Sequence, residues 1–289
     1  MKFVVIGATG QTGKVVAKTL QAAGHDVRAV VRSAAQTQSM FDLGYEAVIA
    51  HVDDVPALTA AFTDVDGVYL MNPPAYFEVD MFAKAHTVHA ALLAAVKAAH
   101  VPHVVALSSV GGQHATGTGN IGTNYDFEQQ IHASGQTVSI LRAPNFLDNW
   151  ASAIASAKEK GILPSMFIPL NKKWPMASSL DIGVTAARLL MANKAAPTLT
   201  ELHGPEDYSA QDAAEALSEL LGKPIQAIEV PTDTIAAYFE NLGFPNVTAQ
   251  AFQEMMYGFN TDHIVFSGEG EAVYGNVSIK EAFALLLSN

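Results

Sequence analysis

Apolar positions in the first half of the chain form short runs that predict buried strands, and amphipathic stretches follow them. The first run, Lys2–Ile6, is almost continuously apolar, and an amphipathic segment from Lys14 to Leu20 leads on to Gly24. Near-continuous apolar runs are typical of parallel strands that are buried on both faces. We expect further strands at residues 25–32, 47–50, 67–71, 102–109 and 136–141.

Helical patterns lie between these runs and continue beyond them. The expected helices cover residues 56–62, 78–99, 124–133, 181–191, 209–221 and 232–242, and Gly222-Lys223-Pro224 ends the fifth of them. The alternation of strand and helix predicts an α/β fold with a doubly wound parallel sheet. After Trp150 several prolines break the pattern, which indicates a second, smaller region.

A glycine-rich turn, Gly7-Ala8-Thr9-Gly10-Gln11-Thr12-Gly13, joins the first strand to the first helix. Gly7 permits a tight turn, Gly10 lets the backbone approach a pyrophosphate, and Gly13 allows the helix to pack closely on the strand. A plain strand–turn–helix is the alternative, because glycine patterns arise by chance in a chain with 21 glycines. The position between a buried strand and a helix favours a dinucleotide site.

The fold class is therefore predicted to be Rossmann-type α/β, with a smaller C-terminal region on the substrate side. We assign residues 1–150 and about 176–203 to the NADP-binding domain, and about 151–175 and 204–289 to the smaller region. The choice of NADP(H) rests on Arg32, which stands after the second strand where NAD-specific sites carry a carboxylate. A guanidinium suits the 2′-phosphate of NADP, although a solvated arginine is the alternative.

Composition narrows the classes of partner. The 289 residues carry 16 Lys and Arg against 28 Asp and Glu, a net charge of −12, which argues against a nucleic-acid surface. No apolar run approaches the roughly 20 residues that span a bilayer, and no signal-peptide core is evident, so we expect a cytoplasmic protein without a membrane partner. The absence of cysteine excludes disulfides, thiolate nucleophiles and sulfur-ligated zinc.

Several motifs occur in an order that covers nearly the whole chain. After the glycine turn these are Val30-Val31-Arg32-Ser33, Ala106-Leu107-Ser108-Ser109, Ser134-Gly135, Ile140-Leu141-Arg142-Ala143-Pro144-Asn145-Phe146, Asp181-Ile182-Gly183 and Leu202-His203-Gly204-Pro205-Glu206. With them the chain resembles the NmrA-like family of atypical short-chain dehydrogenases/reductases, and especially its NAD(P)H:quinone oxidoreductase-like branch.

The resemblance implies that NADP(H) is bound by a set of residues at the strand ends: Gly7, Thr9, Gly10, Gln11, Thr12, Gly13, Arg32, His51, Asn72, Pro73, Ser108, Asn124, Asn145 and Phe146. Two positions depart from the family pattern. His51 stands where many relatives carry an aspartate near the adenine, and Asn124 stands where a lysine often approaches the nicotinamide ribose. The second exchange removes a charge but keeps a hydrogen-bonding group.

The wider superfamily reduces carbonyls with a Tyr-x-x-x-Lys pair, in which the lysine lowers the pKa of the tyrosine. None of the eight tyrosines here has a lysine four residues later, so this local motif is absent. Tyr125, His114 and Ser109 are weak catalytic candidates, because nothing local activates them. Ser108 and Ser109 resemble the superfamily's serine position, and hydroxyls that satisfy a strand end are an equally good interpretation.

A hydride transfer that demands little of the protein remains, with a quinone or similar small acceptor as substrate. Apolar residues that could line its pocket, each also consistent with a place in the core, are Tyr76, Phe77, Met81, Phe82, Phe146, Trp150 and Met255-Met256-Tyr257. The first hypothesis is thus an NADPH-dependent oxidoreductase. The alternative is a non-catalytic NADP(H)-binding redox sensor, in which a loop such as 111–122 responds to the cofactor and alters a protein partner.

His86 and His89 lie three residues apart on a predicted helix and could share a metal ion. No third ligand stands at a suitable spacing, so we predict no metal and interpret both histidines as part of a solvated helix face.

Overall fold

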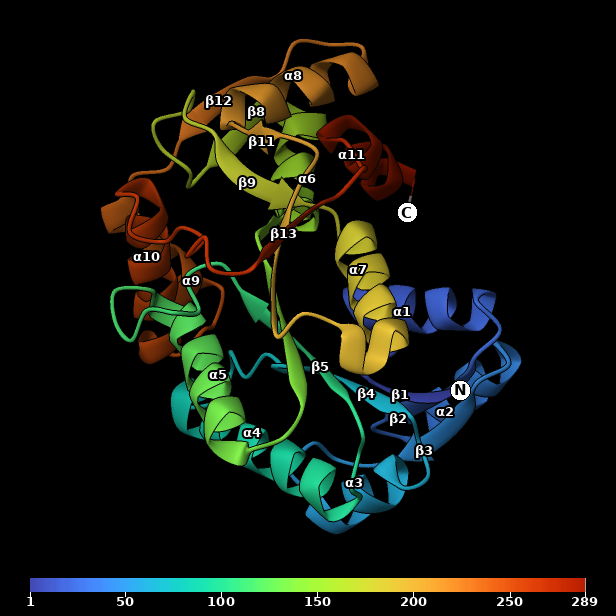
Figure 1. Ribbon diagram of the computed structural model, residues 1–289. Coiled ribbons are helices and arrows are strands. Elements are labelled where there is room, and N and C mark those ends of the chain that lie inside the picture. The colour runs from blue at the N-terminus through green and yellow to red at the C-terminus, as the bar shows by residue number, and fades with distance from the viewer. Residues whose placement is uncertain (289) are drawn as a thin grey trace.

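The computed structural model describes residues 1–288 and confirms the α/β fold, with an eight-stranded parallel sheet covered by helices on both faces (Figure 1). The strand order is β13-β10-β6-β5-β4-β1-β2-β3. The chain runs outward from β1 to β3 and returns to the other side of β1 at β4, so the order reverses between β1 and β4. Ligands of such sheets bind beyond the carboxyl ends of the strands at this switch point.

The strands of the large sheet have the following bounds: β1 Lys2–Ile6, β2 Asp26–Val31, β3 Glu46–Ile49, β4 Gly67–Met71, β5 Val104–Ser109, β6 Val138–Ala143, β10 Leu199–His203 and β13 Glu271–Tyr274. β13 pairs with β10 and so extends the large sheet with residues that the sequence assigns to the smaller region. Its distance along the chain from the other strands hides this pairing from sequence patterns.

Alternate residues of β1 face two separate cores, which explains why the whole strand is apolar. Phe3 and Val5 belong to one core, shared with α1 (Gln11–Ala22), α2 (Ala34–Asp42) and α7 (Ser179–Ala192). Val4 and Ile6 belong to the other, shared with α3 (Val55–Phe62), α4 (Met81–Ala98) and α5 (Gly122–Ser134). All four side chains are at most 2% exposed.

The close contact between α1 and α7 depends on Gly183. A Cβ atom added there would lie 2.5 Å from Cβ of Val15, so any larger residue would push the two helices apart. Since α1 begins at the glycine turn, this packing fixes the direction of the helix at the predicted dinucleotide site.

A third core lies mainly in the predicted smaller region, in the upper part and on the left side of Figure 1. Its helices are α6 Ala151–Lys160, α8 Ala210–Leu221, α9 Ile235–Asn241, α10 Asn246–Asn260 and α11 Ile279–Ser288, and its strands are β8 Ile162–Ser165, β9 Trp174–Ala177, β11 Asp207–Tyr208 and β12 Gln226–Glu229. The short strand β7 Asn145–Phe146 pairs with β9. Short 3-10 turns cover Gly119–Ile121, Leu147–Trp150, Asn193–Ala195 and Thr232–Thr234. The sequence patterns did not predict α6, α10 or α11.

The loop of residues 111–120, before α5, is rich in glycine and threonine and packs against α10. Thr118 is 1% exposed, and a Cβ atom on Gly119 would lie only 1.8 Å from the carbonyl oxygen of Ala251. The loop therefore joins the two regions on the side of the sheet where β4 and β5 end.

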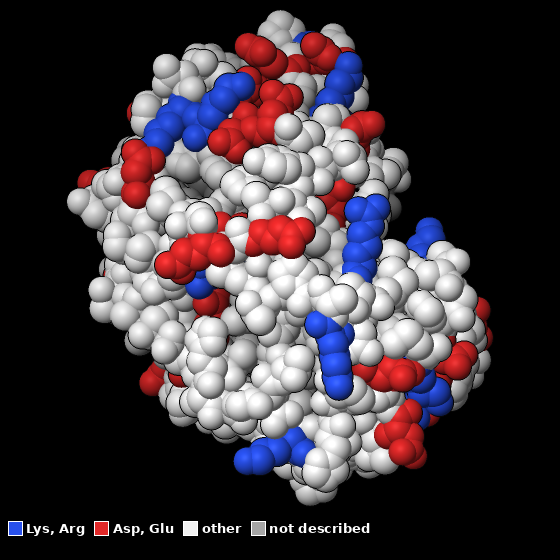
Figure 2. Space-filling model, in the orientation of Figure 1, with Lys and Arg blue, Asp and Glu red and all other residues white. Residues whose placement is uncertain are grey.

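The surface agrees with the charge balance of the chain. On the face drawn in Figure 2, basic side chains lie in small separate groups with acidic side chains between them. Within residues 1–288, no helix has the length and apolar character needed to cross a membrane.

Candidate functional site

The glycine turn presents free backbone donors at the carboxyl end of β1. Gly7 has a φ of +70°, and its carbonyl oxygen accepts a hydrogen bond of 2.8 Å from the backbone N–H of Gly10. No side chain caps the start of α1, and Thr9, Gly10 and Gln11 are exposed. The Gly10 N–H is thus engaged, and the N–H groups of Gln11 and Thr12 at the helix start have the geometry that binds phosphate groups.

Gly13 holds α1 against this turn, because a Cβ atom there would lie 2.1 Å from the carbonyl oxygen of Gly7. The Thr12 hydroxyl points inward and shares a 3.1 Å hydrogen bond with the hydroxyl of Tyr69. Thr12 can therefore offer a ligand its backbone N–H, while its side chain anchors the helix. Burial raises the pKa of Tyr69, whose hydroxyl stays protonated in this pair.

Arg32 and His51 lie at the ends of the next two strands. Arg32 follows β2 and is exposed, and its backbone N–H donates to Oε1 of Gln36 at 3.0 Å. Within the described part of the chain, its guanidinium group has neither an ion pair nor a hydrogen bond. His51 follows β3 and is also exposed. Both side chains are free to contact a ligand on this edge of the sheet.

Asn72 follows β4 and belongs to a buried polar network. Its amide nitrogen donates to Thr123 at 2.6 Å, and its oxygen lies 2.9 Å from Nε2 of His89. Nδ1 of His89 lies 2.8 Å from Asp126, and the His89 ring stacks on Phe127 at 4.5 Å between centroids. The prediction of a solvated face is wrong for His89, which is fully buried because α5 packs on that side of α4.

His86 is the exposed end of this network, since 64% of its side-chain area is accessible and its Nδ1 lies 2.7 Å from Asp126. Gln130 donates to the other oxygen of the same carboxylate at 2.8 Å. Burial opposes ionisation of Asp126, but the hydrogen bonds from His86, His89 and Gln130 outweigh it and lower the pKa of Asp126. Asp126 is therefore an anion at neutral pH.

A second buried network begins at Ser108. Its hydroxyl donates to Glu128 at 2.5 Å, and Arg142 binds the same carboxylate through Nε at 3.0 Å and Nη2 at 2.6 Å. Nη1 of Arg142 lies 3.6 Å from Glu201, which also accepts hydrogen bonds from Ser267. Each of the three charged residues is at most 5% exposed. The Ser108 hydroxyl is thus engaged by protein.

The three catalytic candidates, Ser109, Tyr125 and His114, lie near the carboxyl end of β5 but do not form a catalytic group. The Ser109 hydroxyl donates to the carbonyl oxygen of Val110 at 3.0 Å. Tyr125 lies partly buried in the first turns of α5, next to Asn124, and among residues 1–288 neither side chain has a hydrogen bond to protein. His114 packs on His263, with 4.6 Å between ring centroids. Burial, His263 and Arg142 all lower the pKa of His114, so little of it is protonated at neutral pH and able to act as an acid.

Asn145 and Phe146 form β7, beside β9. The Asn145 amide reaches the carbonyl oxygen of Pro175 at 3.5 Å, at the limit of a hydrogen bond, and Phe146 packs against the first core. Both are partly exposed.

The apolar residues predicted to line an acceptor pocket divide into two groups. Met81, Trp150 and Met256 are at most 6% exposed and belong to the interior. Phe77 is 70% and Tyr257 is 62% exposed, while Tyr76 packs on Phe252 at 5.1 Å and Phe77 on Phe244 at 4.6 Å. Aromatic side chains of the loop before α4 thus join those of α9, α10 and the turn between them.

The carboxyl ends of β1, β2, β3, β4 and β5 therefore bring most of the predicted site residues to one edge of the sheet. Sequence analysis missed the partners that hold them: His89 as a network member, and Asp126, Glu128 and Glu201. The His-x-x-His spacing of His86 and His89 was the available signal, but the acid that joins them lies 37 residues beyond His89. Residues 1–288 contain no cluster of three or more potential metal ligands.

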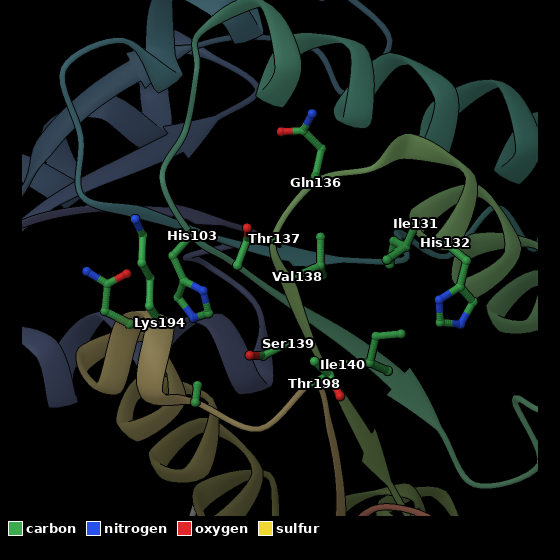
Figure 3. Close-up of a pocket in the computed structure, with 12 residues that line it drawn as sticks. His103, Ile131, His132, Gln136, Thr137, Val138, Ser139, Ile140, Lys194 and Thr198 are labelled. Carbon is green, nitrogen blue, oxygen red and sulfur yellow. The ribbon is translucent and has the colours of Figure 1, made fainter.

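A cavity of about 380 Å³ lies at the opposite end of the sheet, near the start of β6. Figure 3 shows His103, Ser139 and Lys194 on one side of β6 and Ile131 and His132 on the other. It opens away from the glycine turn, because these residues precede or begin the strands whose carboxyl ends form the site. It is therefore separate from the predicted dinucleotide site.

Comparison with known proteins identifies the family. The model of the NmrA-like family matches residues 1–282. The NAD(P)H azoreductase of Xenophilus azovorans is 27% identical over 88% of this chain and 85% of its own length.

Two solved structures share the fold. The NADPH-dependent quinone oxidoreductase of Escherichia coli, solved with NADPH, superposes with a TM-score of 0.82 at 21% identity, covering 99% of this chain and 100% of the other. The triphenylmethane reductase of Citrobacter, solved with NADP(H), has a TM-score of 0.79 at 19% identity, with the same coverage of 99% and 100%.

Proposed function

The chain belongs to the NmrA-like family, and from this membership we propose that it is an NADP(H)-dependent reductase of small, electron-poor acceptors such as quinones. The glycine turn carries the proposal, because its exposed amides and the close fit at Gly13 suit a pyrophosphate. The activities of the relatives, an azoreductase, a quinone oxidoreductase and a triphenylmethane reductase, support the reaction class.

NADP(H) is proposed to lie along the carboxyl edge of the sheet. The helix start at Gly10 and Gln11 holds the pyrophosphate, and the guanidinium group of Arg32 binds the 2′-phosphate in a bidentate manner. His51 is proposed to lie beside the adenine, and Asn72, Asn145 and Phe146 at the nicotinamide end. The guanidinium of Arg32 fits this role, since a new anion would replace no partner among residues 1–288.

A flat aromatic acceptor is proposed to bind near Phe77, in the loop after β4 at the same edge. Phe77 is 70% exposed, so its ring can stack on planar molecules. When bound, NADPH supplies the hydride, and an acceptor that holds negative charge on an aromatic oxygen needs only a weak or solvent-derived acid. This requirement agrees with the environments of Tyr125 and His114, neither of which has an activating partner.

Steady-state oxidation of NADPH tests the proposal. We expect turnover with benzoquinones, naphthoquinones or azo dyes above a protein-free blank, and loss of that turnover in Gly13→Ala, which should displace the helix from the turn. NADPH binding without turnover across the whole panel would refute the reductase and favour the redox-sensor alternative. Absence of NADPH binding would refute both.

A further inference from the structure

The strongest unexplained feature near the proposed site is the buried histidine behind Asn72. His89 is 0% exposed, although its two ring nitrogens contact Asn72 on β4 and Asp126 on α5. The proposed cofactor contact of Asn72 depends on which of its side-chain atoms faces the ligand, and the hydrogen-bond partners of Asn72 within the protein determine that orientation.

Counting hydrogens fixes the state that this arrangement requires. The Thr123 hydroxyl donates to the carbonyl oxygen of Asn120 at 2.8 Å, so it accepts from the amide nitrogen of Asn72. The Asn72 oxygen then faces Nε2 of His89 and needs a hydrogen from it. Because Asp126 is an anion, Nδ1 of His89 must also carry a hydrogen. With the Asn72 carboxamide in this orientation both ring nitrogens carry a hydrogen, which corresponds to an imidazolium His89 paired with Asp126.

A neutral His89 fits the same positions of the non-hydrogen atoms if the Asn72 carboxamide rotates by 180°, so that its nitrogen and oxygen exchange places. Its nitrogen then donates to Nε2 of His89, and its oxygen accepts from the Thr123 hydroxyl. The carbonyl oxygen of Asn120 loses that hydrogen bond. Each arrangement satisfies His89 fully and leaves one N–H of Asn72 unused, but this N–H occupies a different place in the two.

The environment of His89 makes both its neutral and its protonated state accessible. Burial lowers the pKa of His89, while the hydrogen bond and charge of Asp126 oppose this shift and His86 adds to it. Asp126 on α5 and His86 on α4 are the titratable groups that face His89. Asn72 on β4 and Phe127 on α5 are neutral contacts. The neutral arrangement therefore prevails at neutral pH, and acidification populates the imidazolium.

We propose that His89 is a positioning residue: its protonation state decides whether the carboxamide of Asn72 turns its nitrogen or its oxygen toward Thr123, at the edge where the cofactor is proposed to bind. Asp126 holds a hydrogen on Nδ1 in both states, so only Nε2 exchanges its proton. The effect on the cofactor rests on the proposed function, but the coupling between His89 and Asn72 does not.

Nitrogen NMR of wild-type protein labelled at both histidine and asparagine side chains tests the coupling without any turnover. We expect Nδ1 of His89 to remain protonated from about pH 8 to about pH 5, while Nε2 gains a hydrogen and the Asn72 amide signals shift with the same midpoint. A neutral His89 protonated on Nε2, or an Asn72 amide that does not follow its titration, would overturn the proposal.

Substitution of Asn72 provides the second test. Asn72→Asp presents oxygens only, so it should keep the hydrogen on Nε2 and move the His89 titration to higher pH. An unshifted titration in this variant would contradict the proposed coupling. His86→Gln is the matched control, because it changes the exposed contact to the same Asp126 and leaves both ring contacts of His89 in place. We expect it to preserve the Nδ1 hydrogen and the response of Asn72.

The consequence for the cofactor is measured by NADPH affinity against pH. In wild type we expect a change of about fivefold across the His89 titration, the size of one hydrogen bond, and a flat profile in His89→Gln. If NADPH affinity in His89→Gln changes with pH as it does in wild type, His89 does not influence cofactor binding. If NADPH does not bind at all, the proposed function fails while the NMR result still decides the positioning role.

Discussion

The two ends of the proposed cofactor site consist of different chemical groups. At the glycine turn, the proposed site consists of backbone amides and the guanidinium of Arg32, which has no side-chain partner among residues 1–288, and the residues are close in sequence or follow successive strands. Beyond β4 and β5, buried side chains from distant elements form two charged networks, one around Asp126 and one around Arg142. The first end depends on the absence of side chains, and the second on side chains that satisfy one another.

Because of this difference, one end of the site should matter mainly for cofactor binding and the other mainly for the stability of the fold. A glycine that admits a ligand contributes little to the core, whereas a buried charge must have its partner to be tolerated. Substitutions at the glycine turn should therefore act mainly on cofactor affinity, and substitutions in the Arg142 network mainly on folding.

Arg142→Met should have the largest effect of the substitutions considered. It leaves the carboxylates of Glu128 and Glu201, each 2% exposed, without their cation, and should lower the free energy of unfolding by about 3–5 kcal/mol. Urea denaturation measures this loss. Lys280→Ala is the control, because its pair with Glu219 is exposed and should be worth less than about 1 kcal/mol. Equal losses in the two variants would contradict the comparison.

Gly13→Ala should lower NADPH affinity about a hundredfold, because its Cβ atom would lie 2.1 Å from the carbonyl oxygen of Gly7 and displace the helix start. Fluorescence titration measures the affinity, and denaturation should show a smaller loss of stability than in Arg142→Met. Lys18→Ala, an exposed change on the same helix, is the control. Unaltered affinity in Gly13→Ala would place the cofactor elsewhere.

Arg32→Ala should weaken NADPH binding by about tenfold to a hundredfold, the value of a charge-assisted contact, and leave NADH binding unchanged. Parallel titrations of the two reduced cofactors measure the difference. If both affinities fall equally, or neither falls, Arg32 does not recognise a 2′-phosphate.

The smallest effect concerns His103, which is remote from both ends of the site and 1% exposed. Burial lowers the pKa of His103, although the Leu189 backbone opposes this. The folded-state pKa is then below the unfolded value of about 6.5, so the contribution to stability is present above that pH and is lost as pH falls.

His103→Leu should therefore make the free energy of unfolding depend less steeply on pH below about pH 6.5, with a reduction in slope of at most about 1.4 kcal/mol per pH unit. Denaturation at a series of pH values measures the slope, and NADPH affinity should not change. The control is His132→Gln, an exposed residue of the same cavity. A slope that does not differ from wild type in His103→Leu would contradict the buried neutral state.

Sequence patterns were informative wherever the physical cause is local. The strand periodicity of residues 2–6 and the glycine spacing predicted the first strand, its turn and the start of α1, because neighbouring residues determine these conformations. The patterns failed for α10, where Met255-Met256-Tyr257 were considered as pocket residues. Helical rotation buries Met256 and exposes Tyr257, so the three have different environments.

The buried networks could not be predicted because each charge is explained by a partner from another element. His89 has the same spacing from His86 whether its helix face is solvated or covered, and only the packing of α5 on α4 buries it beside Asp126. The sequence by itself determined the parallel sheet, the glycine turn and the position of Arg32, since these follow from short-range periodicity and chirality. The tertiary structure alone decided which polar side chains are buried together, because desolvation and hydrogen-bond partners depend on segments that meet only in the folded chain.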